Sequence, residues 1–282
     1  MRGVNVTTTD FFIPRSVDEA VGLLHEHGAD LTVMGGGTIV MGLINDGRLF
    51  PRKTMSLARA GMASVRDAGD EIEIGAATTI AQLSRLESLP ILAEAASLFG
   101  APAVRHMATV GGNLFAAPPA GDIAVPLLAL DAQVELAGPA GRRTLPLDQF
   151  FTGQGQTGRA PDELVIAIRV PRPAGQSTYL RYGRRQANTP SVVAVAVRLV
   201  ADPDGMLSDA RIALGAAGPH PLRARQAEAA LIGNPFDDAR IASAASAAQA
   251  ECDPPTDALA SGWYRRRMVG VYVRRALESL TR

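Results

Sequence analysis

The stretch Ala108-Thr109-Val110-Gly111-Gly112-Asn113-Leu114 decides the fold of this chain, and it continues to Pro119, Ala120, Gly121 and Asp122. Two adjacent glycines let the backbone approach a ligand without an intervening Cβ atom. Exposed N–H groups in such a loop can form a nest for anionic oxygens, and the Thr and Asn side chains add donors of defined direction. The stretch predicts a loop that contacts an anionic ligand, although an ordinary tight turn has the same glycine content.

A second glycine loop, Gly35-Gly36-Gly37-Thr38, lies upstream, directly after the apolar run Leu31-Thr32-Val33-Met34. That run predicts a short buried strand that delivers the loop. Two separated glycine loops favour a ligand with two adjacent phosphates, such as a dinucleotide. Neither loop has the G-x-G-x-x-G spacing of a Rossmann fold, and the upstream loop lacks the GKS/T ending of an NTPase loop. A Rossmann or P-loop fold is therefore not supported.

The composition predicts a soluble, globular protein of 282 residues, with 47% hydrophobic and 20% charged residues. Lysine plus arginine equals aspartate plus glutamate at 28 each, so no net charge draws the chain to nucleic acid or to a membrane. The single cysteine, Cys252, excludes a disulfide framework within the chain and an iron–sulfur cluster held by this chain alone. Without an apolar leader or a run of about 18 apolar residues, we expect a cytoplasmic protein that does not span a membrane.

The sequence shows no catalytic set of its own. There is no Ser-His-Asp order, no spacing typical of metal ligands, and no paired acid and base. His25 and His27 flank a predicted helix end, where histidines commonly act as caps or face solvent. We expect neither a catalytic residue nor a metal site in this chain.

Helix and strand patterns alternate over the first 170 residues. Ser16 to Glu19 and Thr79 to Gln82 have the spacing of capping boxes, and Gly28 is a helix stop signal. We expect strands at 31–34, 54–57, 71–75, 133–137, 142–147 and 163–170, and helices at 17–28, 79–86, 91–99 and 123–130.

The segment Pro171-Arg172-Pro173-Ala174-Gly175 reads as a stiff, polar linker and is the predicted domain boundary. The arginines of the predicted last helix form either a docking surface for a partner or a solvated face. Beyond the linker we expect strands at 177–183, 191–200 and 209–215, followed by helices at 222–232, 236–250 and 258–280. The predicted class is α+β.

Five short sequence motifs, in their order and spacing, resemble those of a known protein family, and they are called landmarks below. Over residues 10 to 280 the chain resembles the FAD-binding chain of the molybdenum hydroxylases. That family includes the FAD-binding subunit of xanthine dehydrogenase and the medium subunit of carbon monoxide dehydrogenase. The landmarks are Val33 to Thr38, Ile74 to Thr79, Pro102 to Arg105, Ala108 to Asn113, and Leu128 to Ala132.

The resemblance implies a two-domain fold. Residues 1–175 would form a vanillyl-alcohol-oxidase-like (PCMH-type) FAD-binding domain of two α/β subdomains, about 1–60 and 61–175. Residues 176–282 would form a C-terminal domain with a three-stranded antiparallel sheet and a helical bundle.

The resemblance also implies FAD-contacting residues, each of which has a simpler structural alternative. Phe99 also fits a core phenylalanine, Asp122 a helix N-cap, and Leu164 or Val165 plain strand core. FAD would bind non-covalently, since no His or Cys adjoins either loop. The implied contacts are Leu31, Thr32, Val33, Met34, Gly35, Gly36, Gly37, Thr38, Phe99, Thr109, Val110, Gly111, Gly112, Asn113, Asp122, Leu164 or Val165, and Arg181.

Arg181 occupies a position where the family usually has lysine near the isoalloxazine ring. A cation there would stabilise negative charge on the reduced flavin and raise its reduction potential. The alternative is a solvated cation on an edge strand. Residues 184–191 depart from the family pattern, so the electron acceptor stays open between NAD+, a quinone and a carrier protein.

The implied function is electron transfer within an oxidoreductase complex. The chain would accept electrons from a small [2Fe-2S] subunit, hold them on FAD and pass them to an external acceptor, while a large molybdopterin subunit oxidises the substrate. The implied assembly is a heterotrimer, or a dimer of heterotrimers. Two alternatives stay open: a non-catalytic assembly subunit that keeps the fold without flavin, and a self-contained FAD oxidase or reductase.

Overall fold

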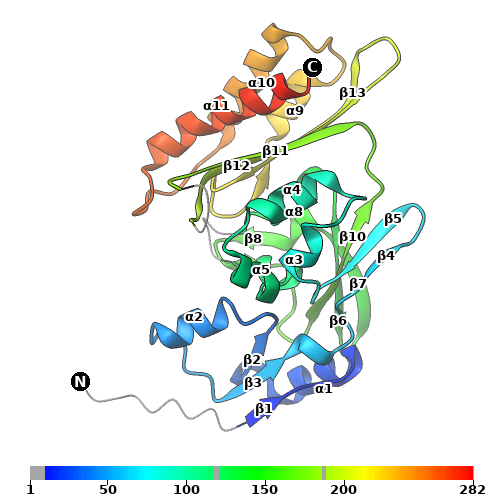
Figure 1. Ribbon diagram of the computed structural model, residues 1–282, viewed down its shortest axis with the longest axis vertical. Helices are drawn as coiled ribbons and strands as arrows, with labels where there is room; N and C mark the ends of the chain where they lie inside the picture. Colours follow the sequence, from blue (N-terminus) through cyan, green and yellow to red (C-terminus); the bar gives the residue numbers. More distant parts are fainter. Residues whose placement is uncertain (1–9, 117–120, 186–188, 282) are drawn as a thin grey trace.

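Three structural units follow one another along the long axis of the molecule, with the N-terminal unit at one end and the last helices at the other (Figure 1). The structure is a computed structural model that describes residues 10–116, 121–185 and 189–281. Pro119 and Ala120 of the central stretch, and Asn188 in the segment that departs from the family, lie outside these ranges.

The first unit is built on a small parallel sheet covered by the helix α1 (Val17–His27). Ser16 begins this helix, because its Oγ accepts a hydrogen bond from the Glu19 N–H at 3.1 Å, and Gly28 ends it with a φ of 52°. The strand order is β1-β3-β2, with β1 Asp10–Phe12, β2 Leu31–Met34 and β3 Lys53–Ser56. The sequence predicted α1, β2 and β3 to within one residue, whereas β1 and the short helix α2 (Val40–Asn45) were not predicted.

The second unit is built on a five-stranded antiparallel sheet with β10 at its centre. β10 is an almost continuous buried run, as expected for a central strand, and its register with β6 shifts between Val165 and Ala167. The predicted hairpin of β6 and β7 is present, whereas the exposed, three-residue β4 was not predicted. The order is β4-β5-β10-β6-β7, with β4 Val65–Asp67, β5 Glu71–Gly75, β6 Gln133–Gly138, β7 Gly141–Pro146 and β10 Leu164–Pro171.

Short helices fill the connections of this unit. The predicted capping box forms, with the Thr79 N–H donating to Gln82 Oε1 at 2.8 Å and the Gln82 N–H donating to Thr79 Oγ1 at 3.2 Å, although the helix ends at Leu83 rather than Leu86. The helices are α3 Ile80–Leu83, α4 Pro90–Leu98, α5 Pro102–Met107, α6 Val110–Asn113, α7 Ala124–Ala129 and α8 Leu147–Phe150. A two-stranded hairpin of β8 (Phe151–Gly153) and β9 (Gln156–Thr157) completes the connections of the second unit. Two 3₁₀ turns lie earlier in the chain: Gly28–Asp30 joins α1 to β2, and Leu57–Arg59 follows β3.

The third unit has four strands, so the expectation of a three-stranded sheet is wrong. The predicted helix at 222–232 begins only at residue 225, because Leu222 and Arg223 pair with β13 as a short edge strand. Two residues are too few to show the alternation by which a strand is recognised. The antiparallel order is β11 Gln176–Gly183, β12 Ser191–Ala201, β13 Leu207–Gly215 and β14 Leu222–Arg223, followed by α9 Arg225–Leu231, α10 Asp238–Glu251 and α11 Gly262–Ser279.

Both faces of this last sheet are covered (Figure 1). Helices α9 to α11 pack on one face and enclose a separate apolar cluster. The other face packs on α4 and α7 of the second unit, and buried side chains of both units form one cluster. The sheet contributes Tyr179, Ala194, Ala196 and Ala213 to that shared core. The apolar core is therefore continuous across the linker at 171–175.

An ion-pair node joins the same two units beside this shared core. Asp131, a non-glycine residue with a φ of 53°, accepts hydrogen bonds from three arginines of neighbouring strands. They are Arg198 Nη2 at 3.0 Å, Arg211 Nε at 2.8 Å and Arg223 Nη1 at 2.6 Å. Burial raises the pKa of Asp131, but the contacts with Arg211 and Arg223 outweigh it, so the pKa lies below its ordinary value.

None of the described helices combines the length and the apolar character that crossing a bilayer requires.

Candidate functional site

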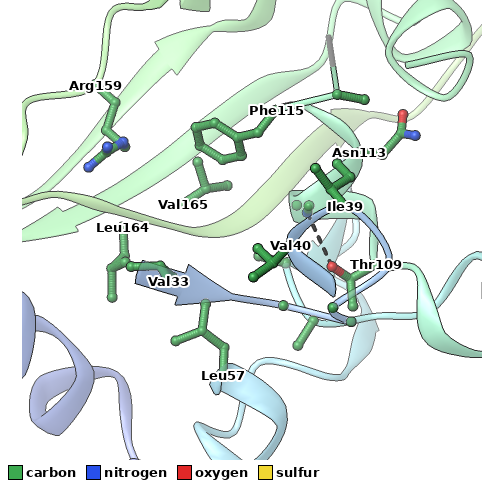
Figure 2. A pocket seen from close by; sticks show the side chains of 18 of the residues that line it. Val33, Ile39, Val40, Leu57, Thr109, Asn113, Phe115, Arg159, Leu164 and Val165 are labelled. Carbon is green, nitrogen blue, oxygen red and sulfur yellow. Dashed lines mark hydrogen bonds between the residues drawn. The ribbon is translucent and has the colours of Figure 1, made fainter. Parts of the chain in front are cut away.

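A cavity of about 610 Å³ lies where the first and second units meet (Figure 2). The first unit contributes β2, the turn after it and the start of α2. The second contributes the segment around Ala76, the α5–α6 region and β10 with the loop before it. The volume falls within the roughly 300–1,000 Å³ of sites for small molecules and cofactors, and such sites are typically apolar with a few polar groups.

The first glycine turn, Gly35 to Thr38, leads from β2 into this cavity. Gly37 has a φ of 76°, which favours glycine over any residue with a side chain. Within the described part of the chain, the N–H groups of Gly36, Gly37 and Thr38 donate no backbone hydrogen bond. Because backbone N–H groups in folded proteins normally have a partner, these three are available to the oxygens of a ligand. This turn has the properties of an anion nest.

The second glycine turn, Thr109 to Asn113, is not a loop but the single helical turn α6 with its cap. Thr109 is the N-cap, and its Oγ1 accepts from the Gly112 N–H at 3.1 Å. The N–H groups of Val110 and Gly111 donate to carbonyl oxygens of the segment at 76–78, both at 2.9 Å. The Asn113 N–H donates to the Thr109 carbonyl oxygen at 2.9 Å. The expectation of free N–H donors is therefore wrong for residues 110–113, because the protein itself uses these groups.

The two turns pack directly against each other. A Cβ atom added to Gly36 would lie 1.5 Å from the Met107 carbonyl oxygen, and one added to Gly35 would lie 2.7 Å from Thr109 Oγ1. A Cβ atom on Gly111 would lie 2.8 Å from both the Cβ and the carbonyl oxygen of Ala76. Glycine is required at these three positions because neighbouring backbone or side-chain atoms lie too close to leave room for a Cβ atom. This requirement holds with or without a ligand.

Most of the predicted contact residues come together around the cavity, while a few lie outside its lining. Thr32 and Met34 alternate with the cavity-lining residues of β2, as successive residues of a strand do, and Val110 is buried in the core. Among the described residues, the predicted ones that line it are Leu31, Val33, Gly35, Gly36, Gly37, Thr38, Phe99, Thr109, Gly111, Gly112, Asn113, Leu164 and Val165. Those outside the lining are Thr32, Met34, Val110, Asp122 and Arg181. Contact of any of them with FAD stays a prediction.

Phe99 follows the last residue of α4, and its predicted contact with FAD stays a prediction. Its ring lines the cavity and also packs against the core of the second unit. Its carbonyl oxygen accepts a hydrogen bond from Arg105 Nη1 at 3.0 Å, which fixes the backbone there.

Asp122 is buried at the junction of the second and third units. It is not the cap of α7, whose N-cap residue is Ile123 and lacks a side-chain cap. Its Oδ2 lies 3.7 Å from Arg181 Nε. Burial raises the pKa of Asp122, and the charge of Arg181 and a hydrogen bond with Ser191 partly offset this effect.

Arg181 is the partner of Asp122, and its side chain is 7% exposed. The alternative of a solvated cation is therefore wrong, although β11 is an edge strand. The guanidinium donates to the Leu98 carbonyl oxygen at 2.7 Å, the Thr189 carbonyl oxygen at 2.5 Å and Ser191 Oγ at 3.1 Å. These contacts hold the end of α4, next to Phe99, against β11.

Several cavity residues were not predicted, among them Phe115, Arg159 and Glu163. They come from the end of α6 and from the loop before β10, and Arg159 lies over the Phe115 ring with 5.9 Å between the guanidinium carbon and the ring centroid. No local pattern marks these positions, because only the tertiary fold brings residue 115 next to residue 159. Ala76 and Ala77 also line the cavity, and they lie within a landmark of the resemblance.

No cluster of three or more His, Cys, Asp or Glu side chains suited to a metal ion occurs among the described residues. The chemistry that the cavity offers is binding: backbone donors at the first glycine turn, apolar walls and one arginine. These groups suit a dinucleotide, with its diphosphate at the turn and its rings against the apolar walls.

The fold and the cavity together define an α+β chain with a cavity suited to a dinucleotide between its first two units. Comparison with known proteins makes this specific. Residues 6–173 match the FAD binding domain in molybdopterin dehydrogenase, and residues 178–280 match the CO dehydrogenase flavoprotein C-terminal domain. The chain belongs to the family of FAD-binding subunits of molybdenum hydroxylase-type dehydrogenases.

Relatives match over nearly the whole length. The carbon monoxide dehydrogenase medium chain of Hydrogenophaga pseudoflava is 33% identical over 276 residues, covering 96% of each chain. The 6-hydroxypseudooxynicotine dehydrogenase complex subunit alpha of Paenarthrobacter nicotinovorans is 31% identical over 274 residues, covering 95% of this chain and 93% of the relative. The structure of a carbon monoxide dehydrogenase from H. pseudoflava superposes with a TM-score of 0.92 and 33% identity, covering 97% of each chain. The expected family and oxidoreductase class are confirmed.

Proposed function

We propose that this chain is the electron-transfer subunit of a molybdenum hydroxylase complex. It takes electrons from a [2Fe-2S] subunit and passes them to an external acceptor. Bound FAD supplies the chemistry, since it takes up two electrons and can exchange them one at a time. The observation that carries the proposal is the cavity between the first two units, with three N–H donors of the first glycine turn at its wall.

The residues of this chain would bind and orient the cofactor without reacting. The N–H groups at 36–38 would hold the diphosphate, and the close packing of the second turn would keep the cavity wall rigid. Apolar side chains from β2 and β10, such as Val33 and Val165, would exclude water from the rings. Excluding water strengthens the hydrogen bonds that the turn makes to the phosphates.

We propose the same division of the chain into subdomains and domains that the resemblance implies. The cavity would lie between subdomains 1–60 and 61–175 of a PCMH-type domain, with residues 176–282 as the C-terminal domain. Two features support this division: separate sheets in the first two units, and family matches that end at 173 and resume at 178.

The proposal requires two partners, a small [2Fe-2S] subunit and a large molybdopterin subunit, in a heterotrimer or its dimer. Support comes from the relatives, which are named as a medium chain and as subunit alpha of a dehydrogenase complex. We place the complex in the cytoplasm. The organic substrate would bind in another chain.

Purification of the full chain tests the proposal. An absorption spectrum should show flavin, and acid precipitation should release all of it into the supernatant. The reason is that the described residues lining the cavity include no His or Cys to form a flavin bond. Yellow colour left in the pellet would contradict non-covalent binding. Absence of flavin in every preparation, together with failure to bind added FAD, would favour an assembly subunit.

A second measurement separates electron transfer from independent catalysis. The purified chain should not oxidise a substrate of the complex by itself. NADH oxidation without partners would indicate either a self-contained reductase or NAD+ as the acceptor of this subunit. Addition of the reduced iron–sulfur subunit should bleach the flavin absorption. Failure of a partner that binds to bleach it would contradict the electron-transfer role.

A further inference from the structure

Arg159 is the one cation among the described residues that line the cavity. It lies just before β10, half-buried, on the side that also carries Phe115 and Val165, and Thr109 lies on the opposite side in Figure 2. Neither the landmarks of the family resemblance nor any local motif includes it.

Among the described residues, only Nη1 of the three guanidinium nitrogens of Arg159 has a hydrogen-bond acceptor. Its Nη1 donates to the carbonyl oxygens of Ala160 at 2.9 Å, Pro161 at 2.9 Å and Glu163 at 2.6 Å. Its Nε and Nη2 donate to no described residue. An arginine carries five N–H donors, so this cavity-lining side chain has donors without an acceptor among the described residues.

The charge of Arg159 also lacks a direct partner among the described residues. The nearby carboxylate of Glu163 is taken by Arg143, whose Nε and Nη2 each donate to it at 2.7 Å, and by the Ala160 N–H at 2.7 Å. Burial lowers the pKa of Arg159, and the more distant charges of Glu163 and Asp162 only partly offset this. A partly buried cation with free donors is costly unless a further acceptor satisfies it.

We propose that Arg159 binds one of the two ring systems of the dinucleotide, donating from Nε and Nη2 to acceptor atoms at the edge of the ring. This inference rests on the proposed function, because it assigns a residue of the same cavity. The ligand chemistry is a flat heteroaromatic ring with nitrogen or oxygen acceptors, which both adenine and isoalloxazine possess.

The position of Arg159 selects a ring over the diphosphate. The free N–H donors for phosphate are at the first glycine turn, at the end of β2. Arg159 instead lies over the Phe115 ring, and the apolar side chains of Leu164 and Val165 line the same cavity. If the diphosphate binds at the turn, a ring would be the part of the dinucleotide left to meet Arg159.

The experiment compares Arg159→Met with a matched control, Arg143→Met. Arg143 holds the same loop through Glu163 and Gly158, but it is not among the described residues lining the cavity. Full-length chain stripped of flavin is titrated with FAD, and the dissociation constant is read from flavin fluorescence. Arg159→Met should weaken FAD binding by about tenfold or more, while Arg143→Met should stay within about twofold of wild type.

Two half-ligands identify the ring. If Arg159 meets adenine, Arg159→Met should weaken binding of ADP and leave binding of FMN and the flavin reduction potential unchanged. If it meets isoalloxazine, FMN binding should weaken, the potential should shift and ADP binding should stay the same. Either result supports the proposal. Equal affinities of the Arg159 and Arg143 variants for all three ligands would overturn it.

Folding is checked on the stripped chain. The melting temperatures of the two variants should fall by similar amounts, since each loses contacts to the loop at 158–163. If Arg159→Met does not fold, Arg159→Lys retains the charge but loses the planar fork, and it should still bind FAD more weakly than Arg143→Met. Wild-type chain that binds no FAD would refute the proposed function itself. Wild-type binding with matched affinities in the two variants would refute only the role of Arg159.

Discussion

The two glycine turns look alike in sequence but differ in how their backbone N–H groups are used. The first turn, Gly35 to Thr38, has three N–H groups without an acceptor among the described residues and a left-handed glycine at Gly37. The second turn, Thr109 to Asn113, uses the N–H groups of residues 110–113 within the protein, and the φ of neither of its glycines is positive. A glycine turn can thus leave its N–H groups available to a ligand or use them within the protein, and the hydrogen-bond partners distinguish these two cases where the sequence does not.

The largest effect should come from Gly36→Ala, although Gly36 belongs to the ligand-facing turn. The added Cβ atom would lie 1.5 Å from the Met107 carbonyl oxygen, so backbone must move. We expect a loss of about 3 kcal/mol in the free energy of unfolding, at the upper end of the usual cost of overpacking. Urea unfolding of the flavin-free chain measures it.

Gly42→Ala in α2 is the control, because no heavy atom lies within 4 Å of its added Cβ atom. It should raise stability by about 0.5–1 kcal/mol, as alanine does in a helix. A Gly36→Ala chain as stable as wild type would show that the turns do not pack as described.

The sharpest test of the comparison lies inside the second turn. Gly111→Ala should lower the free energy of unfolding by about 1–3 kcal/mol, because its Cβ atom meets Ala76 at 2.8 Å. Gly112→Val should instead abolish FAD binding with a smaller loss of stability, since Gly112 lines the cavity and only Thr109 Oγ1, at 3.0 Å, lies near its added Cβ atom. Thermal melts of the flavin-free chains and flavin content are measured together. If Gly111→Ala abolished FAD binding and Gly112→Val mainly lowered stability, then Gly111 would face the ligand and Gly112 would serve packing.

A smaller effect should follow from removing the cap of the second turn. Thr109→Val deletes the acceptor for the Gly112 N–H, and loss of such a cap costs about 0.5–2 kcal/mol. Thr109→Ser keeps the hydroxyl and should stay close to wild type in denaturant unfolding. A loss in Thr109→Ser as large as that in Thr109→Val would contradict the role of the hydrogen bond, because serine keeps the hydroxyl acceptor and lacks only the methyl group.

The smallest expected effect concerns charge beyond the two turns. If the predicted position of Arg181 near the isoalloxazine holds, Arg181→Met should lower the flavin reduction potential by tens of millivolts, at roughly 1.4 kcal/mol per 30 mV for a two-electron couple. Arg181→Lys should restore much of it because the charge returns. Spectroelectrochemical titration decides the matter. Unchanged potentials with a lowered melting temperature would leave Arg181 a purely structural role, through its bonds to Leu98 and Ser191.

Local signals in the sequence predicted much of the fold. The caps at Ser16 and Thr79, the stop at Gly28 and the apolar run of β2 each formed as expected, because a few neighbouring residues determine them. The three-residue β1 and β4 and the two-residue β14 were not predicted, since partner strands stabilise them rather than their own pattern. Each of the three larger sheets therefore contains one short strand that the periodicity of the sequence could not show.

The candidate site was predictable to the extent that it lies on contiguous motifs. Both glycine turns line the cavity, as their sequence suggested. The state of their N–H groups was not predictable, because the acceptors at 76–78 lie more than 30 residues away along the chain. Arg159 and Phe115 were missed for the same reason, since their proximity depends on how the loop before β10 folds back over α6.

The apolar core that continues across the linker at 171–175 has a consequence for protein engineering. A chimera that exchanged residues 1–175 between relatives would cut through packed side chains rather than between modules, since Tyr179, Ala194 and Ala213 belong to the same cluster as α4 and α7. The Asp131 node would be divided too, with its carboxylate from one parent and its arginines from the other. A chimera that exchanges residues 1–175 should therefore also exchange the residues of the β11–β14 sheet that pack against α4 and α7.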